Sequence, residues 1–304
     1  MRTPALCTLV AALALAAGGC GSEDRRPPPD LRLPDSAPAS TTSRVVVIVM
    51  ENKEYEQVIG SDDAPYLTSL GRRYASADRM FGIRHPSLPN YIALIAGDTH
   101  GIDSNCTDCA TGARSLVDQL EAKGRTWKGY MQGMPRPCFR GAFHGGYAKK
   151  HNPFAYLTRI TERPARCARV VPYRELARDV RDGRLPDFAF VTPDLCADTH
   201  DCPVRTGDRF LAKLVPPLMR QLGPRGFLVV TYDEGVSSRG CCGVARGGRI
   251  PTVIAGPDVR RGATGGGPYT LYSLLRTIED FFDVPHLGHA ADARPLDPLF
   301  SRAP

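Results

Sequence analysis

Long apolar runs constrain the fold of this chain more than any other feature of its sequence. The run VVVIVM at residues 45–50 is entirely apolar, and FAFVT at 188–192 and FLVVTY at 227–232 are of the same kind. Strands without polar and apolar alternation are buried on both faces, which is typical of parallel sheets. Segments with helical spacing separate these runs. The sequence therefore predicts an α/β fold with three layers and a central, mostly parallel sheet.

The segments between the strands have apolar residues at helical spacing. We expect Pro216 and Pro217 to kink or interrupt the helix that contains them. Residues 133–172 are rich in Gly, Pro and Cys, and we expect a long irregular excursion there, of a kind that is often functional. The predicted helices cover residues 64–75, a segment starting near Ser87, and residues 115–124, 173–183, 206–222 and 270–282.

The N-terminus predicts export. Residues 1–20 contain Arg2, a short apolar stretch and small residues before Cys20, which is typical of a secretory signal and too short to span a bilayer. The small residues before Cys20 resemble a lipobox, in which Cys20 would be lipidated and would anchor the protein to the membrane; simple cleavage and release is the alternative. Residues 21–43 are rich in Pro and Ser and are predicted to be a disordered tether. Residues 44–304 would form the folded domain, either held at the cell surface or secreted.

Composition narrows the possible partners. The chain has 304 residues with a formal net charge of +7, which favours anionic substrates or surfaces without naming one. No dense basic tract with interleaved aromatic residues is present, so we expect no nucleic-acid partner. We expect a monomer.

Cysteines are numerous for a chain of this length. Apart from Cys7 and Cys20, eight remain, and an even number in an exported protein favours disulfides. The CTDC motif at 106–109 is an alternative half of a zinc site, although no second CxxC completes it. Proximity suggests the pairs Cys106–Cys109, Cys138–Cys167 and Cys196–Cys202, with Cys241 and Cys242 either bridged to each other or paired elsewhere.

Polar side chains follow each of the three apolar strands. Glu51 and Asn52 follow the first strand, Asp194 the second, and Asp233 and Glu234 the third. Ligands of open α/β sheets bind beyond the carboxyl ends of the strands, so these side chains would share one edge. Such a group of carboxylates repels itself unless a cation neutralises it. The pattern predicts a divalent metal site there, whereas each pair taken alone would be an exposed turn or a helix cap.

Ser87 lies between two prolines in HPSLP, at the predicted start of a helix. One interpretation is a helix N-cap, in which its hydroxyl accepts a backbone hydrogen bond. The other is a nucleophile, because a helix N-terminus stabilises a phosphate or an alkoxide and a nearby cation lowers the pKa of the hydroxyl. The motif is not the GxSxG elbow of α/β-hydrolases, which argues against acyl chemistry.

These candidates lie within motifs that follow one another in a fixed order between residues 44 and 290. The motifs are MENKEYEQVIG with APYLTSL, HPSLPNYIALIAG, YAKKHNPF, PDLCADTHDCPVRTGDRFL, LVVTYDEG, RIPTVIAGPDVRRG and YSLLRTIEDFF. The set resembles the bacterial phosphoesterase family of the alkaline phosphatase superfamily, which contains secreted acid phosphatases and phospholipases C. It is similar in order and spacing to small secreted mycobacterial acid phosphatases. The resemblance implies a three-layer alkaline-phosphatase-like fold and a phosphoesterase catalytic domain over residues 44–304.

The resemblance also implies roles for individual residues. Ser87 matches the nucleophile, where phospholipases C usually have threonine, and this favours phosphate monoesters. Where the family has asparagine after the second strand this chain has Asp194, which would add a ligand charge or have no role. Glu51, Asn52, Asp233 and Glu234 match the ligands of one or more divalent cations, His151 and His200 match catalytic histidines that face the phosphate, and Asn90, His85 and Asp198 lie in motifs that bind the substrate.

The function that these residues imply is that of a secreted, metal-dependent acid phosphatase. It would hydrolyse phosphate monoesters, phosphoinositides among them, through a phosphoserine intermediate. The first alternative keeps the site and changes the substrate to a phospholipid diester, as in a phospholipase C. The second alternative is a non-enzymatic lipoprotein that binds a ligand, which would keep the fold and would not need Ser87.

Overall fold

The computed structural model describes residue 33 and residues 39–304. The predicted signal, the lipidation site Cys20 and most of the predicted tether lie outside the described residues, so these expectations stay predictions. Within the described part of the chain, no helix has both the length and the apolar character needed to cross a membrane.

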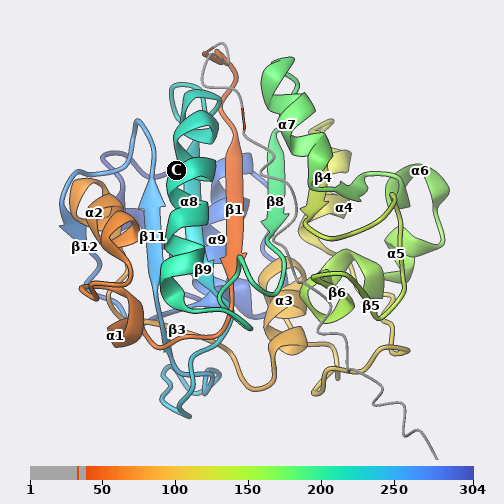
Figure 1. The fold of residues 1–304 in the computed structure, drawn as a ribbon, viewed down its shortest axis with the longest axis horizontal. Coiled ribbons are helices and arrows are strands. Elements are labelled where there is room, and N and C mark those ends of the chain that lie inside the picture. The colour runs from red at the N-terminus through yellow and green to blue at the C-terminus, as the bar shows by residue number, and fades with distance from the viewer. Residues whose placement is uncertain (1–32, 34–38) are drawn as a thin grey trace, which may run out of the picture.

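A central sheet of eight strands organises the domain (Figure 1). Strands β9, β1, β8, β4 and β7 run parallel to one another, and β11 is antiparallel to β9. The three apolar runs of the sequence are adjacent strands, because β1 pairs with β8 on one side and with β9 on the other. In sheet order, the strands are β12 (Ala263–Thr264), β2 (Ala75–Ser76), β11 (Thr252–Ala255), β9 (Phe227–Tyr232), β1 (Val45–Met50), β8 (Phe188–Thr192), β4 (Trp127–Met131) and β7 (Val170–Pro172).

Helices cover both faces of this sheet, which gives the predicted three layers. In Figure 1 helix α8 (Val204–Arg220) lies in front of the sheet and α9 (Leu271–Phe282) lies behind it. Helix α2 (Pro65–Arg73) packs against α8, whereas α3 (Ser87–Ala96) and α4 (Leu116–Ala122) pack against α9. The predicted fold class is confirmed.

Helix α8 is not interrupted at its two prolines. It continues from Val204 to Arg220 through Pro216 and Pro217, so the expected interruption does not occur. Val215 and Leu218, on either side of the prolines, are fully buried. Burial of these apolar side chains stabilises the helix and offsets the backbone hydrogen bonds that the prolines cannot donate.

The excursion after β4 is irregular, as expected, but it is compact. It contains the hairpin of β5 (Phe143–His144) and β6 (Tyr147–Ala148), which leads directly into a short 3₁₀ helix at Lys149–His151.

The remaining small elements are α1 (Tyr55–Val58), β3 (Met80–Phe81), the 3₁₀ helix Pro153–Tyr156, α5 (Thr158–Thr161), α6 (Pro164–Cys167), α7 (Arg174–Arg181), β10 (Arg249–Ile250), β13 (Tyr269–Thr270) and 3₁₀ helices at Gly288–Ala291 and Asp297–Leu299.

All eight cysteines of the described domain form disulfides. Because Cys106 and Cys109 are bonded to each other, their thiolates are not free to bind zinc, and the half-zinc-site alternative is wrong. The adjacent Cys241 and Cys242 form a vicinal bridge instead of pairing elsewhere. The other two pairs are Cys138–Cys167 and Cys196–Cys202, as proximity suggested.

Glu279 in α9 leads to a prediction about stability. Its side chain is fully buried, and this burial raises its pKa from 4.5 to about 8. The N–H of Leu287 donates to one carboxylate oxygen, which offsets only part of the shift, and the other oxygen has no partner among the described residues. The folded state therefore holds a proton that the unfolded chain releases, and stability falls as the pH rises from about 4.5 towards 8. We expect the stability of Glu279→Gln relative to the wild type to increase by about 1 kcal/mol or more between pH 4 and pH 8. Urea unfolding at both pH values tests this, and an equal difference at both would contradict it.

Candidate active site

Three carboxylates meet at the carboxyl edge of the sheet. Glu51 follows β1, and Asp233 and Glu234 follow the neighbouring parallel strand β9. One oxygen from each lies within 4.8 Å of the other two, and all three side chains are buried. The sheet therefore brings together three of the four acidic residues that were predicted at the strand ends, and we refer to these three as the carboxylate cluster.

The carboxylate cluster has the properties of a cation site. Burial raises the pKa of Asp233 well above its usual range, and the charges of Glu51 and Glu234 add to this shift. Burial and the charge of Glu51 also raise the pKa of Glu234. Both carboxylate oxygens of Asp233 are buried without a hydrogen-bond partner among the described residues. Hard oxygen donors that are buried, close together and unpaired fit a divalent cation.

Asn52 is the fourth predicted ligand. It follows Glu51 directly but is only half-buried, and its side-chain oxygen lies 3.5 Å from the ammonium of Lys53. The same ammonium is partly buried beside the cluster, where burial lowers its pKa and the charges of Asp198 and Glu51 oppose that shift. The ligand role of Asn52 stays a prediction.

Ser87 faces the carboxylate cluster. Its hydroxyl lies 3.0 Å from an oxygen of Glu51 and 3.2 Å from an oxygen of Glu234. Pro86 is the N-cap residue and Ser87 is the first residue of α3, so the hydroxyl does not cap the helix. The N-cap interpretation is therefore wrong, and the helix places this hydroxyl at its positive end, next to the candidate cation site.

His151 connects the cluster to the rest of the site. One ring nitrogen lies 2.8 Å from Glu51 and the other 3.3 Å from Asp198, and all three side chains are buried. Burial lowers the pKa of His151, but the two carboxylates outweigh burial and raise it overall. Tyr91 of α3 stacks on the ring, with centroids 5.3 Å apart. The ring of His151 is thus held beside Glu51, the partner of Ser87, and the two carboxylates favour its protonated form.

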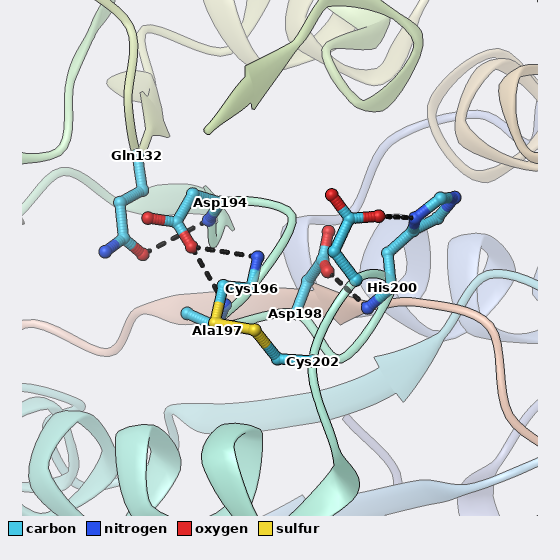
Figure 2. Close-up of a disulfide and its surroundings, with 8 residues drawn as sticks. Gln132, Asp194, Cys196, Ala197, Asp198, His200 and Cys202 are labelled. Carbon is cyan, nitrogen blue, oxygen red and sulfur yellow. Dashed lines mark hydrogen bonds and ion pairs between the residues drawn. A yellow bond between two sulfur atoms is a disulfide. The ribbon is translucent and has the colours of Figure 1, made fainter. Parts of the chain in front are cut away.

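The loop after β8 carries Asp198 and His200 (Figure 2). Asp198 accepts the backbone N–H of His200 at 2.8 Å, and its own burial raises its pKa to about 6. The rings of His151 and His200 are 5.8 Å apart. The disulfide Cys196–Cys202 closes this loop on both sides of the two residues.

Asp194 belongs to the same loop but not to the carboxylate cluster. One of its oxygens accepts the N–H groups of Cys196 and Ala197 at 3.2 and 2.8 Å (Figure 2). Its backbone N–H donates to Gln132. Asp194 therefore shapes the turn that begins the loop, and its carboxylate is engaged there.

Two of the predicted substrate-binding residues, Asn90 and His85, make contacts with other groups of the protein. Asn90 is fully buried and its amide bonds the backbone of residues 83, 84 and 86, which lead into Ser87. His85 contacts Glu234 through one ring nitrogen, and the other lies 2.9 Å from the carbonyl oxygen of Ser237. Both residues hold the segment that presents Ser87 and Glu234, and their predicted contacts with a substrate stay predictions.

Three further residues support the site although the sequence analysis assigned them no role. Glu54 accepts the backbone N–H groups of residues 236, 237 and 249 and so holds the loop that follows Glu234. Asn105 accepts the N–H of Leu88 at 3.0 Å, at the start of α3. Lys150 lies 3.1 Å from the ring of His200. Each acts through a contact between different segments of the chain. Glu54 and Lys150 lie within the family motifs, whereas Asn105 lies outside them.

The fold of this chain resembles that of the alkaline phosphatase superfamily. A solved protein of that superfamily from Vibrio parahaemolyticus aligns with a TM-score of 0.57, covering 84% of this chain and 71% of that one. The two sequences are 16% identical, so this likeness concerns the fold. It confirms the predicted alkaline-phosphatase-like architecture.

The sequence places the chain more narrowly, and it belongs to the Phosphoesterase family, whose profile matches residues 61–285. A phosphatidylinositol-3-phosphatase of Mycobacterium tuberculosis is 31% identical over 263 residues, covering 86% of this chain and 83% of that protein. A probable acid phosphatase of Kluyveromyces lactis is 27% identical over 269 residues, covering 84% of this chain. The chain spans only 62% of the length of that second protein. The family resemblance of the motifs is confirmed.

Proposed function

We propose that this protein is an exported, metal-dependent acid phosphatase that hydrolyses phosphate monoesters through a phosphoserine on Ser87. One observation carries the proposal: the Ser87 hydroxyl lies within 3.2 Å of two carboxylates from different strands, beside the unpaired carboxylate of Asp233. The names of the relatives, which are phosphatases, support the same reaction class.

The cation would be held by Glu51, Asp233 and Glu234, with Asn52 as a further predicted ligand. When bound, a divalent cation neutralises phosphoryl oxygens and lowers the pKa of a neighbouring hydroxyl. The chain's own residues supply the rest. Ser87 would react as the alkoxide that a neighbouring cation stabilises. It attacks phosphorus and forms the Oγ–P bond as the ester oxygen departs, and it is released again as the alkoxide when water attacks the phosphoserine.

Proton transfer falls to a histidine in this scheme. The departing alkoxide takes up one proton, and the water that hydrolyses phosphoserine gives one up, so a single group serves both steps. His151 and His200 were predicted for this role. His151 already contacts Glu51, the partner of Ser87, and holds a proton because two carboxylates raise its pKa.

A phosphate-release screen tests the proposal. The substrates are p-nitrophenyl phosphate, vesicles containing phosphatidylinositol 3-phosphate, and phosphatidylcholine assayed for diacylglycerol. We expect phosphate from the monoesters at acidic pH, loss of at least nine-tenths of it with a chelator, and recovery with a divalent cation. Diacylglycerol without phosphate release would favour the phospholipase C alternative. No hydrolysis of any substrate, with cation present, would favour the ligand-binding alternative.

A further inference from the structure

Lys150 is a cation of the site that the proposed mechanism does not use. It lies in the 3₁₀ helix that carries His151, and its ammonium is 3.1 Å from the Nε2 atom of His200. Its positive charge also acts on the Glu51 carboxylate, the partner of Ser87. The side chain is half-buried.

The hydrogen-bonding capacity of these groups determines where the protons of His200 lie. A lysine ammonium has three donors and no acceptor, so the Nε2 atom of His200 must accept from Lys150. The other ring nitrogen then carries the proton and donates it to Asp201 at 2.7 Å. In this arrangement, neither ring nitrogen of His200 presents a proton to the site. Asp201 orients His200, and His200 orients Lys150.

The neighbouring Lys149 shows that this orientation is specific. Its ammonium donates to the carbonyl oxygen of Thr107 at 2.6 Å and lies 4.4 Å from the centre of the Tyr156 ring. Lys149 is buried among these partners. Consecutive lysines therefore have separate roles, one joining the excursion to the loop around residue 107, and the other pointing towards His200.

We propose that Lys150 binds a non-bridging phosphoryl oxygen of the substrate, and that His200 and Asp201 are positioning residues that hold its ammonium in place. The inference rests on the proposed function and changes one part of it, since His200 then acts through Lys150 and not as the proton donor. The phosphoryl group would lie between the carboxylate cluster with its cation and the Lys150 ammonium. A dianion bound at Ser87 needs positive charge on both sides, because the three carboxylates on one side would otherwise repel it.

The test compares lysine and histidine variants in buffers that hold Mg²⁺ or Mn²⁺. The probe is inorganic phosphate, whose dissociation constant is measured by calorimetry, together with kcat and KM for p-nitrophenyl phosphate. We expect Lys150→Met to weaken phosphate binding and raise KM by about ten- to a hundredfold, the usual effect of losing a charge-assisted hydrogen bond. We expect kcat to change less, and Lys150→Arg to recover most of the affinity.

Lys149→Met is the matched control, because it removes the same charge one residue away. We expect it to lower the melting temperature and leave phosphate affinity within about twofold. Lys150→Met with unchanged phosphate affinity and KM would overturn the proposal. An equal loss of affinity in both variants would overturn it as well, since the effect would then be one of net charge or of general structure.

His200→Gln separates positioning from proton donation. Glutamine keeps a donor and an acceptor, and we expect a raised KM with kcat largely kept. A hundredfold loss of kcat with unchanged KM would show His200 to be the proton donor and would overturn its assignment here. A failure of the proposed function would give a different result, because the wild type would then hydrolyse no ester. Calorimetry would still report whether Lys150 binds phosphate.

Discussion

Replacing Ser87 by alanine is expected to lower kcat for p-nitrophenyl phosphate by roughly three orders of magnitude or more. The variant lacks the oxygen that would form the bond to phosphorus. Among the described residues, no other hydroxyl donates hydrogen bonds to the side chains of both Glu51 and Glu234. Helix α3 should persist, because alanine favours helices and the Ser87 hydroxyl does not cap it. The measurement is steady-state kinetics, with the melting temperature and the metal content recorded on the same samples.

Ser76 offers a matched control for this variant. It is also buried, at the end of β2, and its hydroxyl has no described hydrogen-bond partner. Ser76→Ala should keep near wild-type kcat. If Ser87→Ala keeps more than a tenth of the wild-type activity, Ser87 is not the nucleophile.

Replacing Asp233 by asparagine is expected to have two large and opposite effects. Activity should fall about a thousandfold, because the carboxylate cluster loses one charge and a ligand to the cation. The metal-free protein should instead become more stable, with a melting temperature higher by roughly 2 °C or more at neutral pH. The reason is the raised pKa of Asp233, caused by burial and by Glu51 and Glu234. A raised carboxyl pKa costs stability as the pH rises above the usual value, and asparagine removes that cost.

The Asp233 prediction is measured by kinetics in the presence of the cation and by thermal unfolding in the presence of a chelator. Asp194→Asn is the control, because it alters another buried aspartate that follows a strand but lies outside the cluster. It should keep metal binding and most activity. An Asp233→Asn variant that stays active, or that melts below the wild type without metal, would contradict the assignment.

The strand ends show how far the sequence alone leads. Apolar runs such as 45–50 predict buried parallel strands, and the general rule for open α/β sheets predicts that Glu51, Asp233 and Glu234 share one edge of the sheet. The structure brings these three together because β1 and β9 are adjacent and parallel. The same reasoning included Asp194, since sequence position cannot distinguish a ligand from a residue that closes a turn.

Contacts between distant segments were beyond the reach of sequence patterns. Whether Ser87 caps its helix or faces a carboxylate depends on one residue of helix boundary, which composition does not determine. The direction of Lys150 depends on the hairpin that precedes it, and its partner His200 comes from a loop fifty residues later. Asn90 was predicted to bind the substrate, and its buried amide bonds the backbone that leads into Ser87, a contact that the sequence does not indicate.

Detection of the phosphorylated enzyme tests the central claim most directly. The protein is mixed with a phosphomonoester in the presence of its cation, quenched in acid, digested and analysed by mass spectrometry. The account predicts a phosphoryl group on Ser87, in the wild type and not in Ser87→Ala. Hydrolysis by the wild type without any phosphorylated Ser87, under conditions that trap phosphoserine in a control enzyme, would contradict it.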